Sequence, residues 1–313
     1  MPDFNILITD GLEENGQSIL RAVCGVDDKA GISASALVKA VGGYDALIVR
    51  GRSRVGEEIL AAGKKLKVVG RAGVGVDNID LESAKKHGVT IVNTPIATTL
   101  AVAELTFGLL LAVAREIPRA DAAMKKGEWL KKELEGVELN GKTLGIIGYG
   151  RIGMEVGKRA AAFGMSVVAY DPFISEDEIK TRGAEPVSIQ DLYQWSHFIS
   201  LHLPLDVQTR DLIGPMALSE MKDGVRIVCA ARGGIIDETA LLAALNSGKV
   251  AGVGLDVFTT EPPGPTELIQ HPHVVATPHV GAQTVEAQAR AAEDIANEVL
   301  AALRGQPLRW KVS

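Results

Sequence analysis

The sequence has little cysteine, no excess of basic charge and only one long apolar run. Its 313 residues include two cysteines, Cys24 and Cys229, whose spacing fits neither a metal site nor a redox pair. A disulfide scaffold is therefore excluded, a reducing compartment is the default, and no metal site is predicted. The formal net charge is −6 with Lys and Arg scattered along the chain, so we expect no nucleic-acid partner.

The long apolar run, Pro95 to Ala114, raises the alternative of a membrane span. Glu104 interrupts it, and a carboxylate in mid-span costs about 2.5 kcal/mol or more on insertion scales. Pro and Thr at its start suit a helix N-terminus, and a helix that is apolar all round is usually buried. The N-terminal residues also lack the pattern of a secretory signal. We therefore predict a soluble, cytoplasmic protein with no membrane partner.

Short apolar segments alternate with helical patterns, which predicts βαβ units and parallel sheets. The first series of candidate strands is 4–8, 46–49, 66–69 and 89–92; the second is 144–147, 166–170, 198–201, 225–229 and 250–255. An apolar helix near 98–115 lies between the two series. We expect an α/β protein with two doubly wound domains, 1–97 with 283–313 and 98–282. The final helical pattern, 283–303, could pack on either domain, and we favour the first.

A glycine motif follows the first strand of the second series. TLGIIGYGRIG places Gly148, Gly150 and Gly153 between a strand and a helix, where a turn can approach a pyrophosphate at a helix N-terminus. Such a motif alone is weak evidence, since glycine turns also occur for steric reasons. Asp171 ends the next strand about 18 positions after Gly153, close to the spacing of an acid that binds the adenine ribose. The pair predicts NAD rather than NADP.

Arg232, Asp256 and His279 each follow an apolar strand, at the edge where open α/β sheets bind ligands. The planar guanidinium of Arg232 could bind a carboxylate; a surface salt bridge is the alternative. His279 lies in a short loop where imidazole could accept a proton, although a lone histidine in a turn is often structural. Glu261 could orient that imidazole or be an ordinary loop acid.

The first series contributes GRAGVGVDN after a strand. Gly73 and Gly75 flank Val74, so successive N–H groups could form a nest for a substrate carboxylate. A plain glycine-rich turn is the alternative.

Taken together, GRAGVGVDNIDL, GIIGYGRIG, CAARGGIIDE, GLDVFTTEPP and ATPHVGAQT resemble the D-isomer-specific 2-hydroxyacid dehydrogenase family. The ordered set covers essentially the whole chain. The resemblance implies a flavodoxin-like substrate domain made of both termini, a Rossmann NAD-binding domain between them, and a homodimer formed through the cofactor domain. It implies NAD-dependent oxidation of a small D-2-hydroxy acid.

By the same resemblance, Arg232 binds substrate, Glu261 is the partner acid and His279 takes the proton, while Asp256 would hold the nicotinamide carboxamide. The positions that match cofactor contacts are Val74, Gly148, Gly150, Arg151, Ile152, Gly153, Asp171, His202, Leu203, Pro204, Ala230, Ala231, Asp256, His279, Gly281 and Ala282. Those that match substrate contacts are Arg50, Arg52, Gly73, Val74, Gly75, Lys131, Lys132 and Arg232.

Within the family, LNGKTLGIIG and AGVGLDVFTTEPP most resemble members that act on D-3-phosphoglycerate. A phosphate needs more positive charge than one arginine. Arg50 and Arg52 match basic positions of those members, and Lys131 with Lys132 resemble a loop that reaches the partner's active site. Each could equally be a solvated surface charge.

Two features depart from the family pattern. Ala97 and Thr98 stand where the family commonly has Gly-Asn, which leaves local substrate contacts open. We also expect no C-terminal regulatory domain.

Two alternatives to a D-3-phosphoglycerate-oxidising member remain. One is a glyoxylate, hydroxypyruvate or D-lactate reductase of the same family, and the other is a nucleotide-sensing binding protein like the corepressors that share this fold.

Overall fold

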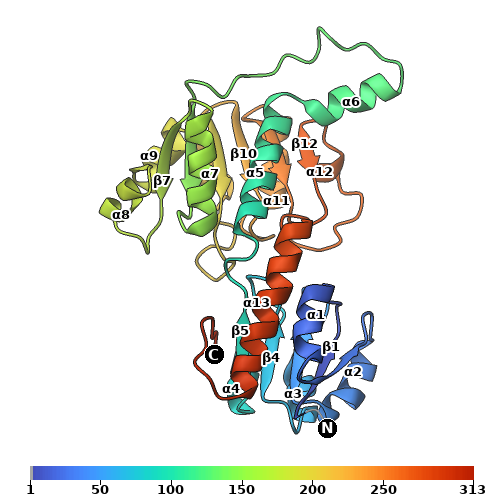
Figure 1. Cartoon of the computed structure of the whole chain (residues 1–313). Helices are drawn as coiled ribbons and strands as arrows, with labels where there is room; N and C mark the ends of the chain where they lie inside the picture. Colours follow the sequence, from blue (N-terminus) through green and yellow to red (C-terminus); the bar gives the residue numbers. More distant parts are fainter. Residues whose placement is uncertain (1–2) are drawn as a thin grey trace. The chain divides into compact units, whose positions relative to one another are not determined.

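The computed structural model describes residues 3–313, which form two compact units. Unit 1 is Met1–Thr98 with Ala282–Ser313, and unit 2 is Thr99–Gly281. Each unit is a parallel sheet with a hydrophobic core on both faces, covered by helices (Figure 1). This arrangement confirms the predicted α/β class with two doubly wound sheets.

The described part of unit 1 has five parallel strands in the order β2-β1-β3-β4-β5, which is the flavodoxin-like order. The strands are β1 (Asn5–Ile8), β2 (Gly25–Asp28), β3 (Ala46–Val49), β4 (Val68–Arg71) and β5 (Thr90–Asn93). The helices are α1 (Glu14–Arg21), α2 (Ala34–Ala40), α3 (Glu57–Ala62), α4 (Leu81–Lys86) and α13 (Val285–Leu303), with a 3-10 turn, η1, at Val41–Gly43.

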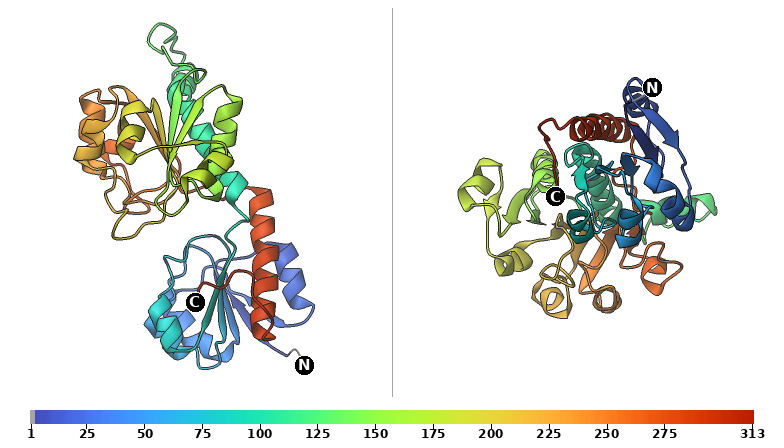
Figure 2. Two further views of the ribbon diagram at one scale, coloured as in Figure 1. Left: turned by 90° about the vertical axis from the view of Figure 1, so that its left-hand side faces the viewer. Right: turned by 90° about the horizontal axis from the view of Figure 1, so that it is seen from below.

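The long C-terminal helix α13 packs against α1 and β4 (Figure 2). At Gly16 in α1 an added Cβ would lie 2.5 Å from the carbonyl oxygen of Ala292, so only glycine allows this approach of the two helices. Ile295, Ala296 and Val299 of α13 are fully buried in the core of unit 1. Beyond α13, Lys311 forms an antiparallel bridge with Val92 of β5.

Unit 2 has seven parallel strands in the order β12-β11-β10-β9-β6-β7-β8, which extends the Rossmann order by one strand. The strands are β6 (Thr143–Ile147), β7 (Ser166–Tyr170), β8 (Glu185–Pro186), β9 (Phe198–Leu201), β10 (Val225–Cys229), β11 (Val250–Leu255) and β12 (Val274–Ala276). The helices are α5 (Thr99–Ala114), α6 (Ile117–Lys125), α7 (Arg151–Ala162), α8 (Glu176–Thr181), α9 (Ile189–Trp195), α10 (Pro215–Glu220), α11 (Glu238–Asn246) and α12 (Glu267–Gln270).

The apolar run of the sequence forms α5, which packs against α7, β10 and β11. Two glycines of β11 permit the contact, because a Cβ on Gly252 would lie 2.7 Å from Val113 and one on Gly254 would lie 2.9 Å from Leu109. Glu104 points outward and forms an ion pair with Arg159 of α7 at 3.1 Å. Among residues 3–313 no helix is both long enough and apolar enough to cross a bilayer.

The sequence missed three edge strands and displaced two others along the chain, β4 by two residues and β5 by one. The short strands β2, β8 and β12 were not predicted, because β2 is half acidic, β8 has two residues and β12 has three. Strand β4 was expected at 66–69 but runs from Val68 to Arg71. Register with β3 fixes that boundary, since Val68 pairs with Ala46 and Arg71 with Val49.

Candidate active site

The glycine turn after β6 has the geometry of a dinucleotide-binding turn. Gly148 has φ +89°, and its Cβ would lie 2.4 Å from the carbonyl oxygen of His202. At Gly153 a Cβ would lie 2.3 Å from the carbonyl oxygen of Gly148, so glycine is needed for α7 to pack on the turn. By contrast, apart from the two neighbouring residues in the chain, no described atom lies within 4 Å of a Cβ built on Gly150, the N-cap of α7. Open space at the N-terminus of α7 fits a pyrophosphate.

Asp171 follows β7 and is fixed beside this turn by the backbone. One carboxylate oxygen accepts the N–H of Tyr149 at 2.8 Å, and the other accepts the N–H of Phe173 at 2.9 Å. Tyr149 stands between the first two glycines of the motif, so the same bond ties the acid to the turn. Each oxygen keeps a further lone pair for a hydroxyl donor. The arrangement fits a ribose diol and disfavours a phosphate at the same place.

The segments after β9 and β10 continue this edge of the sheet. His202, Leu203 and Pro204 follow β9, while Ala230 and Ala231 follow β10 and are nearly buried. The His202 ring is buried and shares a hydrogen bond with the Ser200 hydroxyl at 2.8 Å. Burial lowers the pKa of His202 to about 3, which keeps the ring neutral. Its carbonyl, rather than its ring, faces the glycine turn.

His279 and Glu261 meet, although 18 positions separate them in the sequence. The imidazole Nδ1 lies 2.8 Å from Glu261 Oε2, while Oε1 of the same carboxylate accepts the N–H of Phe258 at 3.1 Å. The His279 side chain is half exposed, with 50% of its surface accessible. Because Nδ1 is engaged by the carboxylate, Nε2 is the ring nitrogen left to exchange a proton with a ligand.

Asp256 holds the loop that carries His279. It follows β11, it is 1% exposed, and one oxygen accepts the Thr277 hydroxyl at 2.6 Å and the Val280 N–H at 2.8 Å. The other oxygen accepts the Gly281 N–H at 2.8 Å. His279 has φ +52°, a left-handed conformation that a non-glycine residue adopts only when its surroundings impose it. The contact of Asp256 with a nicotinamide stays a prediction; sequence reasoning missed its part in shaping this loop.

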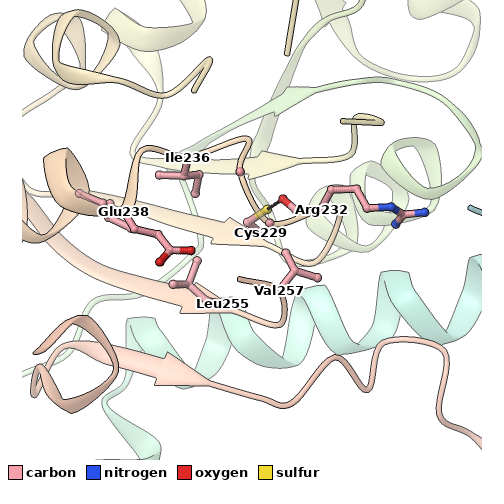
Figure 3. Close-up of a pocket in the computed structure, with 9 residues that line it drawn as sticks. Cys229, Arg232, Ile236, Glu238, Leu255 and Val257 are labelled. Carbon is pink, nitrogen blue, oxygen red and sulfur yellow. Dashed lines mark hydrogen bonds between the residues drawn. The ribbon is translucent and has the colours of Figure 1, made fainter. Parts of the chain in front are cut away.

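Arg232 lies in the turn after β10, and that turn touches the segment that leads to Glu261. A Cβ on Gly233 would lie 1.8 Å from the carbonyl oxygen of Phe258, so the two backbones are in direct contact. Behind the turn is a cavity of about 10 Å³, room for one water, lined by Cys229, Gly233, Glu238 and Val257 among others. Figure 3 shows the Arg232 side chain extending away from this cavity. Burial raises the pKa of the Cys229 thiol to about 11, so it is protonated and inert.

A larger pocket of unit 2, about 490 Å³, is lined by Val113, Glu116, Arg226, Ser247 and His273 among others. It lies where β10 and β11 begin, whereas the motif residues follow the ends of the strands. None of the predicted site residues lines it.

The unit 1 candidates lie after β3 and β4. Arg50 contacts Glu13 and Gln288 through its guanidinium, and the Asp10 carboxylate accepts its backbone N–H at 2.8 Å. Arg52 donates to Asp10 at 3.3 Å and to the carbonyl of Thr9 at 3.0 Å. Hydrogen bonds hold the pKa of the Asp10 carboxyl below its ordinary value despite its burial. Both arginines therefore have carboxylate partners within unit 1, and their contact with a phosphate stays a prediction.

The glycine segment after β4 is shaped by its neighbours. Gly73 has φ +146°, its carbonyl accepts the Thr94 N–H at 3.0 Å, and the Val74 carbonyl accepts the Asn93 side chain at 2.6 Å. Arg71 was not among the residues predicted from the sequence to shape this segment. Its guanidinium occupies the place where a Cβ on Gly73 would be. The signal in the sequence was its position: like Arg50 and Arg232, Arg71 stands at the end of an apolar strand, in VVGRAGVG.

Lys131 and Lys132 lie in the segment that follows α6 and projects from the body of unit 2 (Figure 1). Both lysines are exposed, and the neighbouring Trp129 is 75% exposed. The predicted contact of these lysines with the active site of a partner chain stays a prediction, because the structure contains one chain.

Together the Rossmann strand order, the glycine turn and the oriented acid define unit 2 as a dinucleotide-binding α/β unit. Comparison with known proteins supports this assignment of unit 2. Residues 107–281 match the model of the D-isomer specific 2-hydroxyacid dehydrogenase, NAD binding domain. The chain belongs to the D-isomer-specific 2-hydroxyacid dehydrogenase family, which confirms the resemblance that the sequence motifs carry.

One relative is a D-3-phosphoglycerate dehydrogenase of Methanocaldococcus jannaschii, 46% identical over 96% of this chain and 58% of its own length. The chain thus spans little more than half the length of such curated relatives. A glyoxylate reductase from Paecilomyes thermophila is 34% identical with TM-score 0.91, covering 100% of this chain and 99% of its own. A D-lactate dehydrogenase from Aquifex aeolicus, solved with NAD and lactic acid, is 31% identical with TM-score 0.85, covering 96% of each chain.

Proposed function

We propose that the chain is an NAD-dependent dehydrogenase that oxidises a D-2-hydroxy acid to the 2-oxo acid. The observation that carries the proposal is the His279–Glu261 pair at 2.8 Å, on a loop beside the Arg232 turn. A paired imidazole on a fixed loop is the arrangement of a general base, and a guanidinium nearby is the usual anchor of a carboxylate. A binding protein that only senses nucleotide has no need of this set.

In the proposed reaction Arg232 binds the substrate carboxylate, and the N–H groups of 73–75 add hydrogen bonds to it. His279 Nε2 removes the proton of the C2 hydroxyl, and Glu261 stabilises the imidazolium that forms. As the C2–H bond breaks, the two electrons of the O–H bond become the second bond of the carbonyl. In the reverse direction the protonated His279 returns its proton to the carbonyl oxygen.

NAD would be held by the glycine turn, by the N-terminus of α7 and by Asp171. When bound it accepts the hydride from C2 of the substrate. Asp256 and the residues after β9 and β10 would line the nicotinamide end.

For the substrate we propose D-3-phosphoglycerate, oxidised to 3-phosphohydroxypyruvate as in serine biosynthesis. Support comes from relatives of that name at 41–46% identity across nearly the whole chain. Arg50, Arg52, Lys131 and Lys132 are the candidates for phosphate contacts, and the proposal requires the carboxylate partners of Arg50 and Arg52 to yield to the ligand. Glyoxylate, hydroxypyruvate and D-lactate are the alternative substrates, since a glyoxylate reductase and a D-lactate dehydrogenase share this fold.

The test is a steady-state assay of the purified chain, followed by the near-ultraviolet absorbance of NADH. We expect kcat/KM for D-3-phosphoglycerate to exceed those for D-glycerate and D-lactate by about tenfold or more, and NAD to be preferred over NADP. His279→Ala should lose almost all activity, whereas the matched control His271→Ala should keep it. Comparable turnover of an unphosphorylated acid overturns the substrate, and no turnover of any D-2-hydroxy acid overturns the function.

We further propose a cytoplasmic homodimer that associates through unit 2. Both cysteines are free and buried, which suits a reducing compartment. Ile117 and Met124 of α6 and the following Trp129 are 51%, 57% and 75% exposed, an apolar surface of the kind that partners cover. Light scattering after size exclusion should give twice the chain mass, and Trp129→Ser should shift it toward the monomer.

A further inference from the structure

The segment that carries Glu261 is fixed at two consecutive backbone N–H groups by two different carboxylates. Glu261 itself accepts the N–H of Phe258 at 3.1 Å through Oε1. Glu238 accepts the next N–H, that of Thr259, at 2.7 Å. Glu238 belongs to the first turn of α11, 21 positions away in the sequence, so its bond is tertiary whereas the Glu261 bond is local.

Glu238 is free for this bond because another residue caps α11. The Asp237 side chain accepts the N–H groups of Thr239 and Ala240, each at 3.0 Å. Glu238 at the first helical position therefore has no capping role, and its carboxylate extends toward Leu255, the last residue of β11 (Figure 3).

The Thr259 peptide, which Glu238 contacts, also joins the Arg232 turn to the segment that carries Glu261. A Cβ on Gly233 would lie 2.7 Å from the Thr259 nitrogen, the atom whose N–H Glu238 accepts. Glu238 and Gly233 thus meet the Thr259 peptide together. The cavity of about 10 Å³ beside them has room for one water and little else, so the segment has little space to shift inward.

We propose that Glu238 is a positioning residue for the proton transfer: through the Thr259 N–H it fixes the segment that aims Glu261 at His279. The inference rests on the proposed dehydrogenase function, because it assigns Glu238 a part in that reaction. Without the acceptor, the Thr259 N–H turns to water and the 257–261 segment samples other conformations. The Glu261–His279 contact is then made only part of the time, and turnover falls while dinucleotide binding at the glycine turn remains.

The experiment compares Glu238→Ala, Glu238→Gln and the control Glu82→Ala in the full chain. Glu82 is likewise a first-turn acid that follows an aspartate N-cap, in α4 of unit 1. We expect Glu238→Ala to lower kcat by about tenfold or more, since small misplacements of catalytic groups cost that much, while the Kd for NAD stays within about twofold. Glu238→Gln keeps an acceptor oxygen and should restore kcat to within about threefold. Glu82→Ala should change nothing.

A double variant tests the route. If Glu238 acts through Glu261, adding Glu238→Ala to Glu261→Gln should cost much less than it does alone. Hydrogen exchange of the Phe258 and Thr259 amides gives a readout that needs no turnover, and exchange should quicken by about tenfold or more in Glu238→Ala.

Several results would overturn the inference: a wild-type kcat in Glu238→Ala, a Glu238→Gln variant as impaired as Glu238→Ala, full additivity with Glu261→Gln, or unchanged amide exchange. A Kd for NAD that weakens in step with kcat would overturn it as well, because unit 2 as a whole would then be disturbed. Failure of the proposed function would give a different result. The wild-type chain would then turn over no D-2-hydroxy acid, while amide exchange at Phe258 and Thr259 would still quicken in Glu238→Ala.

Discussion

Replacing Asp256 tests whether one buried carboxylate shapes the His279 loop. Its two oxygens accept three hydrogen bonds, from the Thr277 hydroxyl and from the N–H groups of Val280 and Gly281. The residue is 1% exposed, so water reaches these donors poorly once the carboxylate is removed. Asp256→Ala removes all three acceptor contacts. Asp256→Asn keeps one oxygen but turns an NH₂ group toward a backbone N–H.

The magnitudes follow from the number of bonds and their charge. Hydrogen bonds to charged groups contribute about 1.5–3 kcal/mol each, and neutral ones about 0.5–1.5 kcal/mol. Asp256→Ala removes all three charged bonds and should therefore lower the free energy of unfolding by about 4.5–9 kcal/mol. Asp256→Asn loses one of them and makes the other two neutral, so a loss of about 3.5–6 kcal/mol is expected. Thr277→Val removes one donor and leaves both backbone bonds, so a loss of about 1.5–3 kcal/mol is expected. Because the His279 conformation depends on the same loop, kcat should fall in the order of these losses.

The assay combines urea unfolding, followed by circular dichroism, with turnover and NAD affinity for each variant. A graded loss of stability that parallels kcat supports the loop-shaping role. If Asp256 acts only on the nicotinamide, Asp256→Asn should weaken NAD binding and leave the urea midpoint unchanged. That result, or a Thr277→Val variant as damaged as Asp256→Ala, would refute the reasoning.

Three further predictions concern the cofactor edge. Gly150→Ala should fold with unchanged stability, since its Cβ meets only open space. In a titration it should bind NAD about tenfold or more weakly, because the added methyl would meet the pyrophosphate. Equal affinity of the two proteins for NAD would contradict the proposed fit. Asp171→Ala should raise KM for NAD and narrow the preference over NADP, and an unchanged ratio of kcat/KM values would argue against ribose recognition. The pKa of His202 is lowered to about 3, so the unfolded chain binds its proton first and stability falls as pH drops below about 6.5. His202→Gln should reduce this loss, by about 1.4 kcal/mol for each pH unit, in urea unfolding at pH 6.5 and pH 5; identical pH dependence of both proteins would contradict it.

Much of the fold followed from local patterns in the sequence. Alternating apolar strands and helical segments predicted two parallel sheets, and the glycine motif marked where the second sheet begins. These signals are short in range, since a strand or a turn is encoded by adjacent residues. The edge strands β2 and β8 lack such a signal, because they are short, partly polar and defined by the neighbour with which they pair.

The amino-acid sequence alone determined which side chains are available for chemistry: an imidazole, a guanidinium and a carboxylate proposed to bind a ribose, each after a strand of a parallel sheet. Only the tertiary structure decided how those groups are held. Asp256 bonds to residues 21 to 25 positions away, and Glu238 to one 21 positions away. Such bonds depend on how neighbouring strands align, which no local pattern encodes. The sequence identifies the candidate reacting groups because they lie in motifs, whereas tertiary packing determines which residues hold their loops in place.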